Sequence, residues 1–321
     1  MRFEQGFQGR IAVVTGGGTG MGRELVRQLT AEGCDVATCD VIEENLADTK
    51  ALCADAPGDV FTWIADVSDE GQVLAFRDAV AAWRPQVHLL FNNAGIGGGG
   101  SVLDVDRAEW EKTFDVCWYG VYYNTLAFLP QLMQADVGHV INTSSVNGFW
   151  ATLGPGIPHT AYSAAKFAVK GFTEALITDF RINAPHLRAS VVMPGHIGTS
   201  IAINSRKLLG QDPKEMTSDQ VQKLRERLAK NGLDLSGASD EDIRIGIQAQ
   251  GEAFRDQAPM TASTAATVIL DAVKRGDWRI LVGDDAVLLD EMVRAEPTQA
   301  YEADFLARLH AKGAMKLTDP D

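Results

Sequence analysis

The segment TAYSAAKFAVKGF places Tyr162 four residues before Lys166. In a helix, side chains four positions apart lie on one face, so the phenol and the ammonium can converge. A free phenol has a pKa of about 10, which makes it a poor base near neutral pH. A neighbouring ammonium favours the phenolate, so such a pair can exchange a proton with a substrate oxygen. The spacing also arises by chance, and the rest of the chain must decide its meaning.

A glycine-rich segment, TGGGTGMG at 15–22, directly follows an apolar run and opens a helical pattern. Glycines let the backbone approach a pyrophosphate closely, and a helix N-terminus offers unpaired N–H groups. The spacing is T-G-x-x-x-G-x-G. It differs from the dinucleotide fingerprint G-x-G-x-x-G, because Met21 and Leu25 occupy the positions of its last glycine. It also differs from a P-loop, because Arg23 follows the segment where a lysine would stand. The segment predicts a dinucleotide-binding turn.

Asp40 ends the second apolar run, about twenty residues after the glycine turn. A carboxylate there can accept hydrogen bonds from the adenosine ribose hydroxyls. A 2′-phosphate would be repelled by about 4 kcal/mol at 4 Å and an effective dielectric of 20. No Lys or Arg lies in 16–22 or 40–42 to offset that repulsion. The sequence therefore predicts NAD rather than NADP as the cofactor.

The elements that must position these residues follow from the alternation of apolar runs and amphipathic segments. Nearly all-apolar strands separated by helices imply a parallel sheet covered on both faces. We expect an α/β, doubly wound (Rossmann) sheet of seven parallel strands in one domain over 1–321. The expected strands are 11–16, 34–40, 60–67, 87–95, 139–145, 188–195 and 278–283, and the expected helices include 22–33 and one long helix over 110–133.

Two segments lie outside the alternation. The stretch 201–260 is polar, with helical patches such as 218–232. A connection that long is usually functional, so we expect a helical lobe or lid beside the substrate site, with a plain surface insertion as the alternative. The segment 284–321 is expected to form a helical C-terminal tail.

Composition excludes several classes of protein. A net charge of −14 argues against nucleic acid and anionic membranes as partners, because both require clustered Lys and Arg. The chain shows no secretory leader pattern and no run of eighteen apolar residues, so we expect a cytoplasmic protein. Cys34, Cys39, Cys53 and Cys117 form no C-x-x-C pair, which indicates reduced thiols and no metal site.

With NNAG at 92–95, a serine after the fifth strand, Y-x-x-x-K and PGHIGT at 194–199, the chain resembles a short-chain dehydrogenase/reductase from about residue 9 to 199. The resemblance implies that Tyr162 is the catalytic acid/base and that Lys166 lowers its pKa. Of two adjacent serines, Ser145 rather than Ser144 matches the position that orients the substrate oxygen. His159 and His196 flank the site as candidate substrate contacts, with structural roles as the alternative.

The resemblance also implies where the cofactor lies. Asp66 and Val67 would bracket the adenine, and the segment from Pro194 to Thr199 would hold the nicotinamide carboxamide. Together with the turn and Asp40, the expected cofactor contacts are Gly16, Thr19, Gly20, Met21, Gly22, Asp40, Val41, Asp66, Val67, Asn93, Ala94, Gly95, Tyr162, Lys166, Pro194, Gly195, Ile197 and Thr199.

One residue departs from the family pattern. The family usually has an asparagine where this chain has Cys117, and that asparagine supports a water that relays protons to the catalytic lysine. A thiol is a weak hydrogen-bonding group and replaces it poorly. Asn124 lies two turns along the helix and cannot reach the same place. We expect the enzyme to stay active, either with a relay through a backbone carbonyl or with slow turnover.

These observations predict an NAD-dependent oxidoreductase acting on a secondary alcohol or ketone. The long lobe and tail suggest a bulky, apolar substrate. One alternative is an NADP-linked carbonyl reductase, which Asp40 opposes. Another is a dinucleotide-sensing protein with little turnover, which only Cys117 favours. The resemblance also implies a homodimer or homotetramer that pairs through helices at 110–133 and 161–183.

Overall fold

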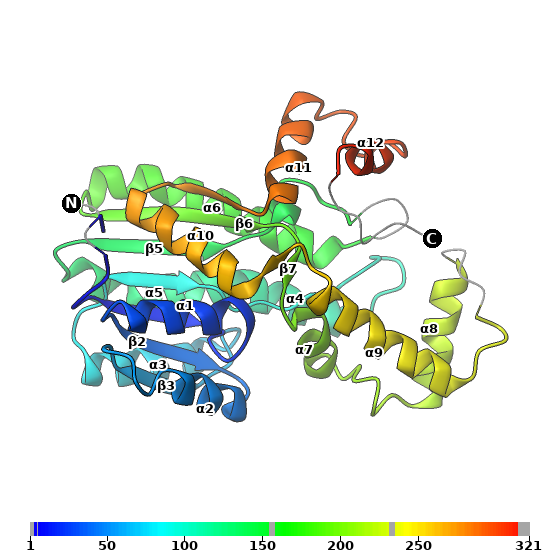
Figure 1. The fold of residues 1–321 in the computed structure, drawn as a ribbon, viewed down its shortest axis with the longest axis horizontal. Coiled ribbons are helices and arrows are strands. Elements are labelled where there is room, and N and C mark those ends of the chain that lie inside the picture. The colour runs from blue at the N-terminus through cyan, green and yellow to red at the C-terminus, as the bar shows by residue number, and fades with distance from the viewer. Residues whose placement is uncertain (1–2, 5, 154–157, 231–234, 314–321) are drawn as a thin grey trace.

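A computed structural model describes residues 3–4, 6–153, 158–230 and 235–313. Its centre is a sheet of seven parallel strands in the order β3-β2-β1-β4-β5-β6-β9 (Figure 1), so the predicted doubly wound fold is confirmed. The strands are β1 (Ile11–Thr15), β2 (Asp35–Asp40), β3 (Val60–Ile64), β4 (Leu89–Asn92), β5 (Gly138–Thr143), β6 (Leu187–Pro194) and β9 (Arg279–Val282).

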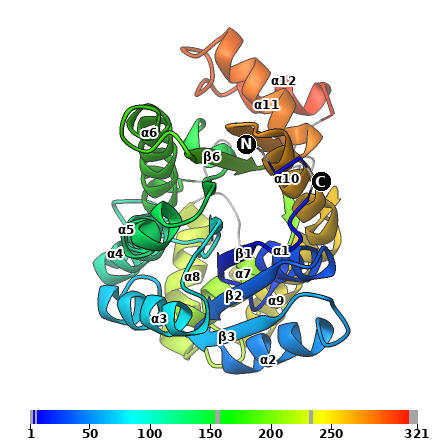
Figure 2. The same cartoon turned by 90° about the vertical axis from the view of Figure 1, so that its left-hand side faces the viewer.

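Helices cover both faces of the sheet because alternate strand residues point to opposite sides. Ala12 and Val14 of β1 pack in one core with α1 and α10, whereas Val13 packs in the other with α3, α5 and α6 (Figure 2). The helices around the sheet are α1 (Gly20–Ala31), α2 (Glu43–Leu52), α3 (Glu70–Trp83), α4 (Arg107–Phe114), α5 (Gly120–Met133), α6 (Thr160–Asn183) and α10 (Ala262–Arg275).

The strand order places a crevice at the centre of the sheet. β1 lies between β2 and β4, so the strand order reverses at β1, and ligands of such sheets bind at the carboxyl ends beside this reversal. Thr15, Asp40, Asn92 and Thr143 are each the last residue of a strand and therefore lie along this one edge.

The prediction of one continuous helix over 110–133 is wrong in one respect. A π-helical turn, Asp115–Tyr119, separates α4 from α5. A π-turn fits an extra residue into a helix and often marks a functional site. Here it buries Val116 and Cys117 together. The following Gly120 packs so closely on the segment after β3 that an added Cβ would lie 2.7 Å from Val67 Cγ2.

A buried chain of polar side chains fixes α6 against the strands. The Asn92 amide donates to Asn142 Oδ1 at 2.8 Å, and the Asn142 amide donates to Thr173 Oγ1 of α6 at 2.9 Å. Buried polar groups must be paired, so these bonds restrict how α6 can sit on the sheet. Because α6 carries Tyr162 and Lys166, the network also sets the position of that pair.

The segment expected to form a lobe is helical, with α7 (Ile201–Leu208), α8 (Ser218–Lys230) and α9 (Asp240–Asp256); residues 231–234 lie outside the described part. These helices lie at the carboxyl ends of the strands (Figure 1). A small core of Met216, Val221 and Ile243 holds the lobe together. A short ribbon of β7 (Ile197–Gly198) and β8 (Met260–Thr261) joins it to the sheet domain.

The C-terminal segment forms α11 (Asp284–Ala295) and α12 (Phe305–Ala311), while residues 314–321 lie outside the described part. All four cysteines are buried and unpaired. Among the described residues, no helix combines the length and apolarity needed to cross a membrane.

Candidate active site

Three candidate catalytic residues meet at the junction of β5 and α6. Lys166 is buried, and its Nζ donates to the Thr143 carbonyl at 2.9 Å while lying 5.4 Å from the centre of the Tyr162 ring. The Ser145 side chain is close enough to Tyr162 to act on its phenol and to lower the pKa of that group. The structure therefore brings Ser145, Tyr162 and Lys166 together, although they come from two elements.

The two neighbouring serines have different surroundings. The Ser144 hydroxyl donates to the Lys166 carbonyl at 2.7 Å, so it helps to hold α6 on the sheet. The Ser145 hydroxyl accepts from the backbone N–H of Asn147 at 3.1 Å and caps the short 3₁₀ turn Val146–Gly148. Of the two serines, Ser145 is the one that acts on the pKa of Tyr162, and its role as the substrate-orienting residue stays a prediction.

Burial dominates the acid–base properties of the pair. Loss of solvent, with a smaller contribution from Cys117, raises the pKa of Tyr162, while its hydrogen bond to Ser145 acts in the opposite direction. Burial also lowers the pKa of Lys166. The direction for Tyr162 is opposite to the one expected from the lysine, because desolvation of the phenolate outweighs the attraction of an ammonium that is itself turned to Thr143.

The glycine turn has the close packing that a dinucleotide site needs. Gly16 has a φ of +69°, and an added Cβ would lie 2.8 Å from Ala94 Cα. At Gly22 an added Cβ would lie 2.0 Å from the Gly16 carbonyl oxygen. Thr15 Oγ1 accepts from the backbone N–H groups of Asn93 and Ala94 at 3.0 and 3.1 Å. The turn and NNAG therefore form one unit.

Asp40 lies directly beneath this turn. Its Oδ2 accepts from the Gly18 N–H at 3.0 Å, and its Oδ1 accepts from the Ile42 N–H at 3.1 Å. Burial raises the pKa of Asp40, and these backbone donors partly oppose the rise. The nearby Arg23 is engaged elsewhere, since it donates to the Asn45 carbonyl and the Thr49 hydroxyl.

Three further candidate cofactor contacts, Asp66, Val67 and Val41, differ in burial and in hydrogen bonding. Asp66 accepts from Lys112 at 2.6 Å and from the Ser68 hydroxyl at 2.6 Å. Burial acts to raise the pKa of Asp66, but these donors outweigh it and the pKa is lowered. Val67 is buried, whereas Val41 is exposed at the rim beside Asp40.

The two histidines occupy different places. The His159 ring lies 4.7 Å from the Tyr162 ring, and burial lowers the pKa of His159 to about 4. His196 points away towards the lobe, with Nε2 2.7 Å from the Phe254 carbonyl and its ring centre 4.3 Å from that of the Phe254 ring, at an interplanar angle of 46°. His159 therefore stays a candidate substrate contact. The contacts of the His196 side chain with Phe254 favour a structural role for it.

Cys117 lies beside Lys166 without a hydrogen bond to it. Its thiol donates to the Ile96 carbonyl at 3.2 Å. A Cβ added to Gly95 would lie 3.5 Å from Lys166 Nζ and 3.7 Å from Cys117 Sγ, which are ordinary contact distances, so Gly95 is next to both side chains. Asn124 donates to the Gly120 carbonyl at 2.8 Å, so its amide is occupied within its own helix.

Sequence reasoning missed one residue near the cofactor turn. The Asn204 amide, on α7 of the lobe, donates to Thr19 Oγ1 at 3.2 Å. Thr199 packs there as well, and its Cγ2 would lie 3.1 Å from a Cβ on Gly20. No local pattern marks Asn204, because its proximity to the turn depends on how the lobe folds back. Pro194 and Ile197, which precede Thr199 in the same segment, are buried.

The arrangement suits proton transfer beside a bound dinucleotide. A phenol, a hydroxyl and an ammonium converge on one side of the crevice, and a glycine turn at a helix N-terminus lies on the other. The described part of the chain holds no group of three His, Cys, Asp or Glu side chains placed to bind a metal ion.

Comparison with known proteins shows to which family the chain is similar. The family model for short chain dehydrogenases matches residues 10–209. A putative oxidoreductase, SadH, from Mycobacterium tuberculosis is 32% identical over 288 residues, covering 90% of this chain and 91% of that protein. Levodione reductase from Leifsonia aquatica is 33% identical over 221 residues, covering 67% of this chain and 80% of that protein.

Solved structures agree with this result. A short-chain dehydrogenase/reductase from Burkholderia phymatum in complex with NAD superposes with a TM-score of 0.75 at 28% identity, covering 92% of this chain and 97% of that one. A metagenomic short-chain oxidoreductase in complex with NADP gives a TM-score of 0.52 at 29% identity, covering 59% and 83%. The chain therefore belongs to the short-chain dehydrogenase/reductase family and is an oxidoreductase.

Proposed function

We propose that this protein transfers hydride between NAD and a secondary alcohol or ketone, with Tyr162 as acid/base. The observation that carries the proposal is the convergence of Ser145, Tyr162 and Lys166 at the junction of β5 and α6. In alcohol oxidation Ser145 orients the substrate oxygen and Tyr162 takes its proton. Lys166 stabilises the Tyr162 phenolate that accepts this proton, and it then relays the proton of the resulting phenol onward along the Thr143 side.

The residues of the crevice fit a dinucleotide. Bound NAD supplies the hydride acceptor, and its positive ring favours a phenolate nearby. The Gly16–Gly22 turn would hold the pyrophosphate, Asp40 the adenosine ribose and Lys166 the nicotinamide ribose. The Pro194–Thr199 segment would hold the carboxamide. The close approach of Gly16 to Ala94, which leaves no room for a side chain, supports this placement.

The lobe and tail suggest the kind of substrate. Helices α7 to α9 and the tail stand at the carboxyl ends of the strands, on the side where substrates of such sheets bind (Figure 1). We infer that residues 201–260 act as a lid over a bulky, apolar alcohol or ketone. Four unpaired buried cysteines fit an enzyme that works in the reducing cytoplasm.

Exposed apolar side chains support an oligomer. Tyr119, Leu126 and Met133 are exposed seven residues apart around α5, and Phe167 and Ile182 are exposed on α6. We infer that these helices pair two copies of the chain in a homodimer or homotetramer.

The Tyr162→Phe variant tests the acid/base role. Removing the hydroxyl should lower kcat by about 10³-fold, the typical contribution of general acid–base catalysis. NADH binding should persist. The measurement is NAD reduction over a panel of secondary alcohols of graded size, with Tyr119→Phe as the matched control outside the site. A Tyr162→Phe enzyme that keeps wild-type kcat on the best alcohol would contradict the assignment.

Asp40→Asn tests cofactor choice. The amide keeps an oxygen for the Gly18 N–H but removes the charge that repels a 2′-phosphate. The ratio of kcat/KM for NAD to that for NADP should fall by roughly 10- to 100-fold, since each tenfold step is about 1.4 kcal/mol. Asp48→Asn, an exposed carboxylate near Arg23, is the control. A wild-type enzyme with a lower KM for NADPH than for NADH would favour the NADP-linked alternative.

Cys117→Asn tests whether the thiol limits turnover. If Lys166 exchanges protons along the Thr143 carbonyl, kcat should change by less than about tenfold, because one modest hydrogen-bonding contribution is exchanged. Cys117→Ala serves as the companion variant. A gain of several orders of magnitude in Cys117→Asn would instead mean that the wild-type relay is crippled, as in a protein that senses dinucleotides.

Leu126→Glu tests the oligomer. A charge in the centre of the proposed helix pairing should shift the protein towards monomer in sedimentation velocity. Leu103→Glu, an exposed leucine outside these two helices, should leave the mass unchanged. Wild-type protein that sediments as a monomer at micromolar concentration would exclude the pairing.

A further inference from the structure

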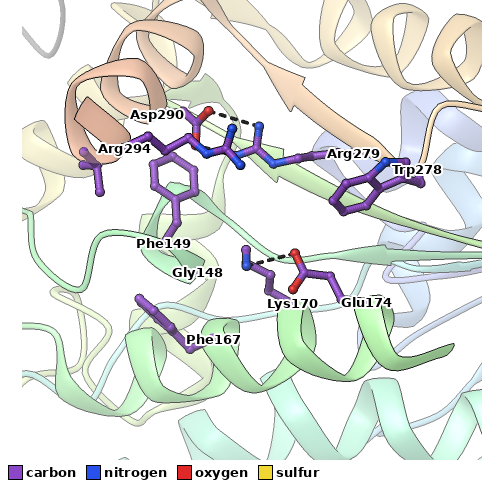
Figure 3. Close-up of a pocket in the computed structure, with 10 residues that line it drawn as sticks. Gly148, Phe149, Phe167, Lys170, Glu174, Trp278, Arg279, Asp290 and Arg294 are labelled. Atoms are coloured by element: carbon purple, nitrogen blue, oxygen red, sulfur yellow. Dashed lines mark hydrogen bonds and ion pairs between the residues drawn. The ribbon is translucent and has the colours of Figure 1, made fainter. Parts of the chain in front are cut away.

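The C-terminal tail is fastened to the sheet at its edge strand. Arg279 of β9 forms a paired ion contact with Asp290 of α11, in which Arg279 Nη1 lies 3.0 Å from Asp290 Oδ2 (Figure 3). Asp290 is almost fully buried, and breaking a buried ion pair is costly, so α11 is held firmly in place. The helix borders a pocket that Phe149, Phe167 and Trp278 line as well.

The first turn of α11 reaches the segment expected to hold the carboxamide. Asp285 Oδ2 accepts from the His196 N–H at 2.7 Å. A Cβ added to Gly195 would lie 2.3 Å from both carboxylate oxygens, so the backbone there is pressed against Asp285. The other oxygen, Oδ1, is buried and has no hydrogen-bond partner among the described residues. The helix N-terminus favours the charge of this carboxylate.

The far end of the tail reaches the loop after Ser145. Trp150 Nε1 donates to the Ala300 carbonyl at 2.7 Å, and the Ala151 N–H donates to the Tyr301 hydroxyl at 3.0 Å. The Trp150 ring packs 5.7 Å from the Phe305 ring of α12.

Asn147 continues this connection into the site. Its side-chain amide donates to the Trp150 carbonyl at 3.0 Å, and its backbone N–H donates to Ser145 Oγ. An unbroken path of contacts therefore runs from the tail to the candidate substrate-orienting hydroxyl.

We propose that the helical tail is a positioning element of the active site: Asp285 fixes the Gly195–His196 backbone on the nicotinamide side, and residues 300–301 fix the Ser145 loop on the substrate side. This inference rests on the proposed function. The tail lies beyond residues 10–209, which the family model matches. Neither Asp285 nor Tyr301 touches reacting atoms, and both act through backbone that they hold.

Variants of Asp285 test the nicotinamide side. Asp285→Ala removes the acceptor of the His196 N–H and should raise the Kd for NADH about tenfold, as expected for a lost hydrogen bond to a charged group. Asp285→Asn keeps an acceptor oxygen and should restore binding to within about threefold of wild type. Asp284→Ala, the exposed neighbour in the same helical turn, is the matched control. NADH fluorescence titration gives the Kd without requiring turnover.

Tyr301→Phe tests the substrate side. Loss of the bond from the Ala151 N–H should raise the KM for the best alcohol about threefold to tenfold and leave the Kd for NADH unchanged. A purely structural role would lower Tm and raise both the KM for the alcohol and the Kd for NADH. A change in KM alone in Tyr301→Phe, and in the Kd for NADH in Asp285→Ala, is therefore the diagnostic result.

Different outcomes would overturn the positioning role of the tail and the proposed oxidoreductase function. Wild-type NADH affinity in a folded Asp285→Ala, or equal effects of Asp285→Ala and Asp284→Ala, would overturn the positioning role. Unchanged KM in Tyr301→Phe would overturn the substrate arm. Wild-type protein that binds neither NADH nor NADPH would instead refute the proposed function itself.

Discussion

A buried ammonium is the constraint on which the catalytic end of the molecule depends. Lys166 is only 2% exposed, and a buried charge is costly unless it is hydrogen-bonded. The Thr143 carbonyl provides that bond because β5 ends at this residue. Ser145 follows two residues later, so one strand end supplies both the acceptor for Lys166 and the hydroxyl beside Tyr162. The Asn142–Thr173 and Ser144–Lys166 bonds then hold α6 at the required height.

The opposite side of the crevice is organised around a half-buried carboxylate. Asp40 accepts from the Gly18 N–H of the turn above it and from the Ile42 N–H that follows it, while Arg23 donates to the Asn45 carbonyl of α2. The lobe also contacts this glycine turn, because the Asn204 amide donates to Thr19 Oγ1 and Thr199 packs on Gly20. The lobe therefore lies against the place where a pyrophosphate would bind, in addition to its proposed role as a lid over the substrate.

Much of this could be predicted from the sequence because it depends on local pattern. Apolar runs located the seven strands, and motif order located the glycine turn, Asp40, Ser145 and the Tyr162–Lys166 pair. The π-turn could not be predicted, because the 3.6-residue periodicity of 110–133 continues through it. Nor could the orientation of His196, which depends on Phe254 of a helix some sixty residues later. The contacts of Asn204 and Asp285 are likewise tertiary, since each joins segments that are far apart in the sequence.

The most direct measurement of the central claim follows the hydride itself. The enzyme would be incubated with NAD and a secondary alcohol that carries deuterium on its carbinol carbon, and the reduced cofactor would be analysed by mass spectrometry. Direct transfer predicts NADH that carries one deuterium, with a primary isotope effect whenever the chemical step limits the rate. Reduced cofactor without deuterium, or bound NAD with no reduction by any alcohol in the panel, would contradict the account.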